Sequence, residues 1–223
     1  MPEWWSYTLS DFLLFSPRTY YRLIERHNEA VWPAQLLMSG LGLAIAALLH
    51  RPSPRRGQAV SAVLAALWIG VAWSFVWQRY ATINWAAKYL VWLFVTEAVL
   101  LLWVGVRQHG LVLGGPTGVV RYLGAALLLL GLLAYPMIAP LVHRGWHQAE
   151  VFGVVPDPTA VATLGFLLQA GGPYRWVAMV PPILWCLVTA ATLYALGSAE
   201  AWIPAAAALL ALAGLRARAM AAR

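Results

Sequence analysis

The chain has 223 residues, of which 62% are hydrophobic and only 10% are charged, and its net charge is +7. A soluble domain carries roughly 25% charged residues, so this composition excludes an ordinary water-soluble protein. The basic residues are scattered between apolar runs, which argues against a nucleic-acid partner and is typical of residues that flank membrane spans. We therefore expect an all-α protein whose main partner is the lipid bilayer.

The first predicted unit, residues 1–30, is an amphipathic segment at the membrane interface. Ser16 followed by Pro17 is a favoured helix start, with Ser as the cap and Pro in the first helical position. Basic residues then recur every four positions and form one stripe on the expected helix, at Arg18, Arg22 and Arg26. Such a stripe, with apolar residues elsewhere on the helix, is typical of a helix lying in the interface plane.

The second predicted unit, residues 31–223, is a polytopic transmembrane helical bundle. Its apolar segments lie at 31–50, 58–78, 85–106, 119–142, 158–171, 176–197 and 201–215. A helix needs about 20 residues to cross the hydrocarbon core, so the fifth and seventh segments are short. The pattern predicts about seven spans. The alternative is six spans plus a re-entrant segment at 158–171.

Charge predicts the orientation of these spans. The linker after the first span carries Arg51, Arg55 and Arg56, and the tail carries Arg216, Arg218 and Arg223. Basic residues favour the cytoplasmic side, so both segments are expected there. Two points on one side require an even number of crossings between them, which spans two to seven supply. The C-terminus is therefore expected in the cytoplasm.

Glu97, near the middle of the third span, is the first candidate functional residue. A carboxylate at that depth costs several kcal/mol unless it is protonated, paired or hydrated, so an intramembrane acid indicates function. Glu97 would then carry a proton or bind a cation. The alternative is a protonated acid that is hydrogen-bonded to a neighbouring helix, for example to Tyr135 or Thr189.

Lys88 is the second polar residue of this span, and it shares a helix face with Trp85 and Trp92. It could lie over an indole ring, or extend to the interface because it is near the start of the span. Gln78, Arg79 and Asn84 lie close to Lys88 in the sequence. Together these residues would form a polar cluster at one membrane face, which could be the mouth of a cavity.

The spacing of histidines and acids in the loop after the fourth span suggests a metal site. His143 and His147 are four residues apart, and Glu150 and Asp157 could add oxygen ligands. Gly145 argues against a regular helix between the two His, so a solvated or proton-collecting loop is the alternative. We find no nucleotide fingerprint or catalytic motif, and we expect neither a cofactor nor an enzyme activity.

Asp157 stands between Pro156 and Pro158, a sequence that predicts a helix start with Asp157 as its cap. The helix ends near residue 170, so it spans about 20 Å, less than the ~30 Å hydrocarbon core. A short helix with an irregular lead-in is how transporters build sites at the membrane midplane. The alternative is an interfacial loop followed by a short embedded span.

Residues 5–23 (WSYTLSDFLLFSPRTYYRL) and 152–166 (FGVVPDPTAVATLGF) resemble two recurring segments of a family of bacterial multi-pass membrane proteins known only as a domain of unknown function. The resemblance covers the whole chain. It implies a protein of the bacterial inner (cytoplasmic) membrane, and it implies no activity.

Together these features predict a small-solute or proton-linked transporter, a channel or a membrane sensor. Its intramembrane polar site would contain Glu97, Lys88, Asp157 and Tyr135. The alternative is a non-catalytic accessory subunit of a larger membrane complex.

Overall fold

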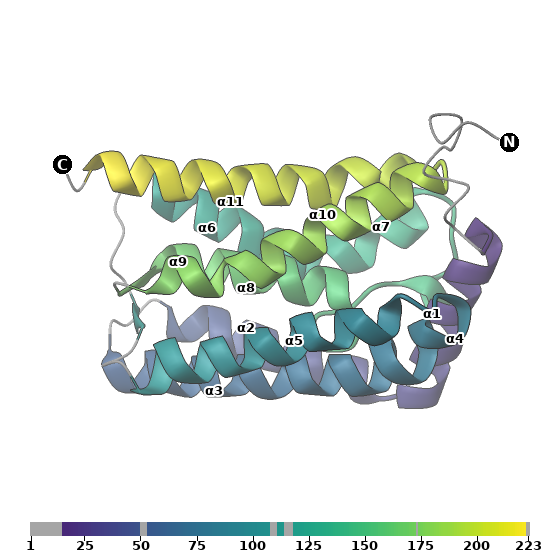
Figure 1. Ribbon diagram of the computed structural model, residues 1–223, viewed down its shortest axis with the longest axis horizontal. Helices are drawn as coiled ribbons and strands as arrows, with labels where there is room; N and C mark the ends of the chain where they lie inside the picture. Colours follow the sequence, from purple (N-terminus) through teal and green to yellow (C-terminus); the bar gives the residue numbers. More distant parts are fainter. Residues whose placement is uncertain (1–14, 50–52, 108–110, 114–117, 173, 222–223) are drawn as a thin grey trace, which may run out of the picture.

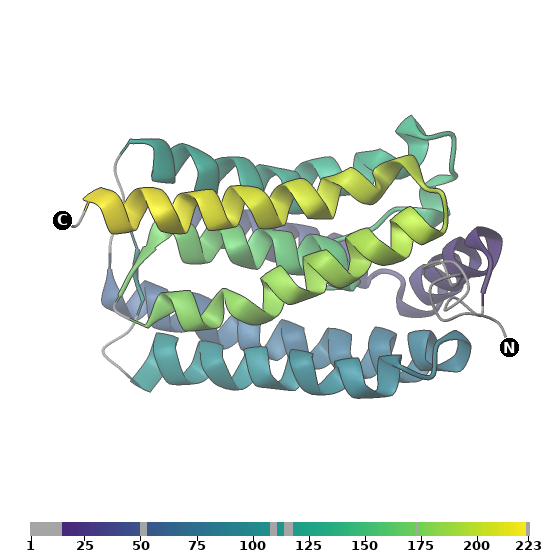
Figure 2. The same ribbon diagram turned by 45° about the horizontal axis from the view of Figure 1, so that its top comes forward.

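The computed structural model is a bundle of helices that run back and forth between two ends (Figure 1, Figure 2). It describes residues 15–49, 53–107, 111–113, 118–172 and 174–221. At one end, β1 (Val112–Leu113) pairs antiparallel with β2 (Ala170–Gly171), and we name it the ribbon end after this two-stranded β-ribbon. At the other, the cap end, α1 (Pro17–Val31) lies across the bundle.

Five continuous helical segments of the described chain are long and apolar enough to cross a membrane. The first is α3 (Pro54–Val71) with the π-helix η3 (Ala72–Tyr80) and α4 (Ala81–Ile83), and the second is α5 (Ala87–Leu102) with the π-helix η4 (Trp103–Arg107). The third joins α6 (Val119–Leu129), the π-helix η5 (Leu130–Ala134) and α7 (Tyr135–Leu141). The last two are α9 (Arg175–Ala178) with α10 (Val180–Ala195), and η7 (Ala199–Ala201) with α11 (Trp202–Ala221). The predicted helical class is confirmed.

Two shorter helices also run between the ends, α2 (Ala34–Leu48) and α8 (Pro156–Gln169), with 15 and 14 residues. The axes of α1 and α2 differ by 89°, so this pair forms a corner, and it raises the number of candidate spans to six only if it is counted as one. α8 starts from the cap side and is followed by β2 at the ribbon end, so it does not turn back as a re-entrant segment would (Figure 1). The predicted short seventh segment is wrong, because its helix extends to Ala221.

The predicted start of α1 is confirmed. Ser16 is the N-cap and its hydroxyl accepts a hydrogen bond from the Thr19 amide at 3.3 Å, with Pro17 in the first position. The arginine stripe is exposed, and the opposite face of α1 is buried against the bundle through Tyr20, Leu23, Ile24, His27 and Asn28. The first fourteen residues of the predicted interfacial unit lie outside the described residues.

α8 is enclosed by the other helices, and every residue from Pro156 to Leu168 is buried. Its sequence is apolar on all sides, which is typical of a helix in the centre of a bundle. Glycines let the backbones approach closely: a Cβ on Gly165 would lie 2.6 Å from the Leu128 nitrogen, and one on Gly131 would lie 2.7 Å from the Ala162 nitrogen. Close packing of α6 and η5 on α8 therefore depends on these glycines.

The C-terminal end of α8 is capped by a side chain from another helix. Arg218 of α11 donates hydrogen bonds from Nη1 to the carbonyl oxygens of Leu168 at 3.1 Å and Ala170 at 2.7 Å. Terminal helix carbonyls lack partners within their own helix, and a basic side chain both pairs with them and opposes the negative end of the helix dipole.

We expect Gly165→Val to destabilise the bundle by about 1–3 kcal/mol or more, because the new side chain would overlap the α6 backbone. Gly70→Val is the matched control, since a Cβ there meets no atom within 4 Å. Thermal unfolding in detergent checks this. Equal unfolding temperatures for the two variants would contradict the packing argument.

Candidate functional site

Asp157 lies in the first turn of α8 and is anchored to α10. Its Oδ1 accepts hydrogen bonds from Trp185 Nε1 at 2.6 Å and from Thr189 Oγ1 at 2.9 Å, and the residue is 4% exposed. α8 begins at Pro156 with Val155 as its N-cap, so the prediction that Asp157 caps the helix is wrong. Its carboxyl bonds a neighbouring helix instead. Two donors and the positive end of the helix dipole offset part of the cost of burying it.

The chain enters α8 through an irregular segment, residues 149–155, which is largely buried. Thr159 organises its end: the Oγ1 atom accepts a hydrogen bond from the Gly153 amide at 2.8 Å and donates one to the Val155 carbonyl at 2.7 Å. Irregular backbone at membrane depth is tolerated only where it is buried in protein or lines a cavity. Sequence analysis missed Thr159, although its tendency to bond a backbone carbonyl four residues earlier was a usable signal.

Two further acids, Glu150 and Glu200, are buried on the cap side of the bundle, each 8% exposed. Glu200 forms an ion pair with Arg144 and accepts a hydrogen bond from Tyr21 Oη at 2.9 Å. Glu150 interacts electrostatically with Asp157 and with Glu200. Burial raises the pKa of Glu150 well above its usual value, the charge of Asp157 raises it further, and Arg144 opposes both. We name Glu200, Glu150 and Asp157 the acid series.

Tyr135, the first residue of α7, belongs to the same region. It interacts electrostatically with Asp157 and Glu150, and its buried hydroxyl has no hydrogen-bond partner among the described residues. An unpaired buried hydroxyl costs about 1–3 kcal/mol. Tyr135 makes no hydrogen bond with Asp157, and its free hydroxyl leaves room for one more polar contact.

Glu97 is fully buried on α5 but stands apart from the acid series. Neither of its carboxyl oxygens has a hydrogen-bond partner in the described part of the chain. Phe94, one turn earlier, packs against Trp185 with ring centroids 4.8 Å apart, so aromatic rings occupy the neighbouring space toward Asp157. The alternative bonds to Tyr135 or Thr189 are not formed, because that tyrosine hydroxyl is unpaired and Thr189 donates to Asp157.

Lys88 does not belong to the interior site. It is exposed, and so are Trp85 and Trp92, at 65% and 69%. Within the described residues, the cation–π contact found is that of Arg144 over the Tyr21 ring, 4.0 Å from its centroid. The predicted role of Lys88 in the intramembrane site is therefore wrong, since an exposed lysine near a helix start extends to the interface.

The residues of the predicted polar mouth, Gln78, Arg79 and Asn84, do not form one cluster. Gln78 is exposed, whereas Asn84 stabilises the turn between α4 and α5: its Nδ2 donates to Tyr80 Oη at 3.1 Å and its Oδ1 accepts from the Ala86 amide at 3.0 Å. Arg79 alone of the three lines a groove, which it shares with α1.

The predicted metal site is not formed. His143 and His147 are exposed, whereas Glu150 is buried. No three His, Cys, Asp or Glu side chains of the described ranges are grouped so that they could hold a metal ion. The loop turns sharply at His143, which has a φ of 61°, and the short 3₁₀ helix Trp146–Gln148 follows it.

α1 holds this loop in place over the acid series. Asn28 donates from Nδ2 to the carbonyls of His147 at 2.9 Å and Ala149 at 2.8 Å, and His27 Nε2 lies 3.2 Å from the Val154 carbonyl. Burial lowers the pKa of His27 to about 4, so its ring is neutral near pH 7 and can donate this bond from Nε2. Sequence analysis did not identify either residue, because their partners lie more than a hundred positions away.

These features define a class: a helical bundle with membrane-spanning helices by length and composition, buried carboxyl groups and a short enclosed helix. The chain belongs to a family of unknown function, DUF6064, whose model matches residues 18–223. No curated protein and no solved structure matches it significantly.

Trp185→Phe should lower stability by about 1–3 kcal/mol, because it removes one of the two donors to the buried Asp157. Trp202→Phe is the control, since Trp202 is 72% exposed. Chemical or thermal unfolding in detergent measures both. An unchanged midpoint for the Trp185 variant would show that this hydrogen bond contributes nothing.

His27 should make stability depend on pH in a defined window. The pKa of His27 is about 4 in the folded protein and 6.5 in the free residue. Because the unfolded chain binds this proton more readily, the contribution of neutral His27 to folding stability is complete above pH 6.5 and is lost as the pH falls toward 4. The full loss is about 3 kcal/mol. The unfolding midpoint of His27→Gln should therefore fall less between pH 6.5 and pH 4 than that of the control variant His147→Gln. Parallel pH profiles would contradict it.

Proposed function

We propose that the chain is an integral protein of the bacterial inner membrane with seven crossings and the ribbon end in the cytoplasm. The described residues at the ribbon end include seven arginines and no acid: Arg55, Arg56, Arg107, Arg121, Arg175, Arg216 and Arg218. At the cap end, basic residues are mixed with acids, among them Glu25, Glu29, Glu150 and Glu200. The described part of the cap end carries five arginines and Lys88, so the ribbon end has the larger number of basic residues, which supports this orientation.

Within the membrane, we propose a proton-linked function, with transport of a small solute as the leading form and a channel or sensor as related forms. The observation that carries the proposal is the pair of buried acids, Glu97 without a partner and Asp157 held by two donors. A carboxylate at such depth costs several kcal/mol unless it is compensated. No described side chain pairs with Glu97, so its carboxyl group has no structural hydrogen bond to account for it.

The mechanism follows from the cost of charge. In the proposed mechanism Glu97 carries its proton in this conformation, because no described side chain donates a hydrogen bond to it. Losing the proton requires water or a cation to reach it, and therefore a different packing of α5. The acid series would take up protons on the cap side, with Glu150 protonated more readily than an exposed acid. The Phe94 and Trp185 rings would have to move before a proton could pass between Asp157 and Glu97. Protonation and helix packing are thereby coupled.

The short enclosed helix supports the same proposal. An irregular, buried lead-in followed by a short helix is the arrangement in which transporters place a site near the midplane. Residues 149–155 and α8 have this form, and Asp157 stands at their junction. Tyr135 adds an unpaired hydroxyl on the neighbouring helix.

Proton flux into proteoliposomes under an imposed pH gradient tests this function, with a panel of small solutes added in turn. We expect Glu97→Gln and Asp157→Asn each to reduce flux at least roughly tenfold, because neither side chain can then exchange a proton. Glu29→Gln, at an exposed position of α1, is the matched control and should retain flux. Full flux in the Glu97 and Asp157 variants would refute the proton-linked role.

A second candidate, an accessory subunit of a larger membrane complex, is favoured by one surface. A shallow apolar groove of about 250 Å³ lies between α10 and η7–α11 and is lined by Ala190, Ala191, Tyr194, Ala201, Trp202 and Ala205. Small residues on an outer helix face allow another helix to approach closely. This candidate predicts that Ala191→Leu releases a co-purifying membrane partner while Glu97→Gln does not.

A further inference from the structure

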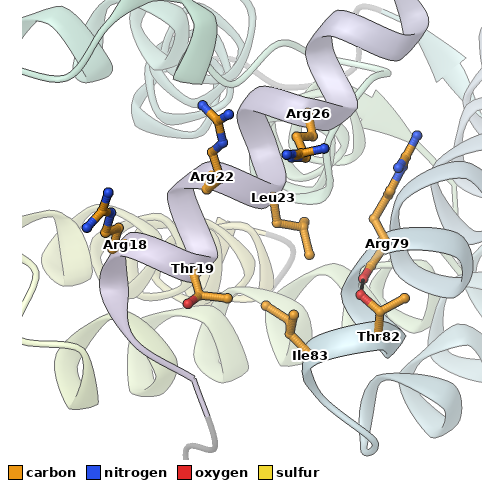
Figure 3. Close-up of a pocket in the computed structure, with 8 residues that line it drawn as sticks. All are labelled: Arg18, Thr19, Arg22, Leu23, Arg26, Arg79, Thr82 and Ile83. Carbon is orange, nitrogen blue, oxygen red and sulfur yellow. Dashed lines mark hydrogen bonds between the residues drawn. The ribbon is translucent and has the colours of Figure 1, made fainter.

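A basic groove lies at the cap end, between α1 and the end of the η3–α4 segment (Figure 3). Its volume is about 380 Å³. Three arginines of α1 contribute to its walls, Arg18, Arg22 and Arg26, together with Arg79 of η3. The aliphatic side chains of Leu23 and Ile83 form its apolar part. The groove therefore combines four cations with an apolar surface.

The four arginines line one groove because of helix periodicity and of the position of η3 beside α1. The α1 arginines are spaced by four residues and so follow one face of that helix. In Figure 3, Arg79 rises from the opposite wall to the level of Arg26. Thr82 donates a hydrogen bond to the Arg79 carbonyl at 2.7 Å, which fixes the backbone from which this arginine extends.

The positive charge of the groove is largely uncompensated. No acidic side chain of the described residues lines it. Arg22 forms an ion pair with Glu25 at 2.6 Å, but no described acid pairs with Arg18, Arg26 or Arg79. Like charges brought together without an anion repel one another, so this arrangement favours an anionic occupant.

The position of the groove points to the headgroup level of a bilayer. Several exposed tryptophans lie in or beside cap-end elements: Trp32 follows α1, Trp85 stands between α4 and α5, Trp146 follows α7, and Trp202 begins α11. Tryptophan concentrates at the membrane–water interface, where lipid phosphates also lie. Because α1 lies across this end, its arginine stripe lies at the same level.

We propose that this groove binds a phosphoryl group, the phosphate of an anionic phospholipid or a soluble phosphate-bearing anion. Arginine forms bidentate hydrogen bonds with phosphate oxygens, and Arg26 and Arg79 belong to opposite walls of the groove. Leu23 and Ile83 give the remainder of the ligand an apolar surface. The site is separate from the acid series, and the proposal does not depend on proton-linked transport.

Binding of short-chain probes to the purified protein in detergent tests the site. Dioctanoyl phosphatidylglycerol and inorganic phosphate are compared with dioctanoylglycerol, which has the same chains and no phosphoryl group. We expect the double variant Arg26→Gln/Arg79→Gln to bind phosphatidylglycerol at least roughly tenfold more weakly, because charge-assisted hydrogen bonds are lost. Arg121→Gln/Arg216→Gln removes the same charge from exposed positions at the ribbon end and should change the affinity less than about twofold.

The arms identify the source of the phosphoryl group. Phosphatidylglycerol binding that inorganic phosphate does not displace indicates a lipid, whereas displacement at millimolar phosphate indicates a soluble anion; both results support the site. Equal affinities of the two double variants, or equal binding of dioctanoylglycerol, would overturn it. Arg26→Lys/Arg79→Lys keeps the charge without the planar donor pair, and an intermediate affinity is expected.

Discussion

The enclosure of α8 is the constraint on which the other parts of the structure depend. A helix buried on all sides has terminal N–H and C=O groups that water cannot reach, so neighbouring elements must pair with them. Prolines at 156 and 158 remove two of the donors at its start, Thr159 binds the lead-in, and Arg218 caps its end. Other helices surround it, and glycines at the α6 contact set how closely they approach.

The same enclosure connects the site to the cap. The irregular segment before α8 must be held by something other than regular backbone hydrogen bonds, and α1 supplies the contacts through Asn28 and His27. Tyr21 on α1 also bonds Glu200, the outermost acid of the series. α1 is therefore held to the rest of the bundle by hydrogen bonds as well as by its buried apolar face.

Sequence reasoning succeeded where the signal was local. The Ser16–Pro17 helix start, the long apolar helices and the burial of Glu97 follow from nearby residues. It failed where the outcome depended on distant partners: Asp157 turned to Trp185 and Thr189 instead of its own helix start, and Lys88 faced outward. The spacing of His143 and His147 suggested a metal site, but backbone conformation after Pro140 leaves both exposed.

The contacts of α1 have a consequence for biosynthesis. This helix is the first described element to leave the ribosome, yet Tyr21 bonds residues 177 and 179 positions later in the chain. At 5–20 residues per second, synthesis of those partners takes on the order of ten seconds or more. During that interval the face of α1 that carries Tyr20, Leu23 and Ile24 has no completed bundle to cover it. An amphipathic helix can bury its apolar face in the bilayer surface during this interval, so the amphipathic character of α1 serves assembly as well as the finished structure.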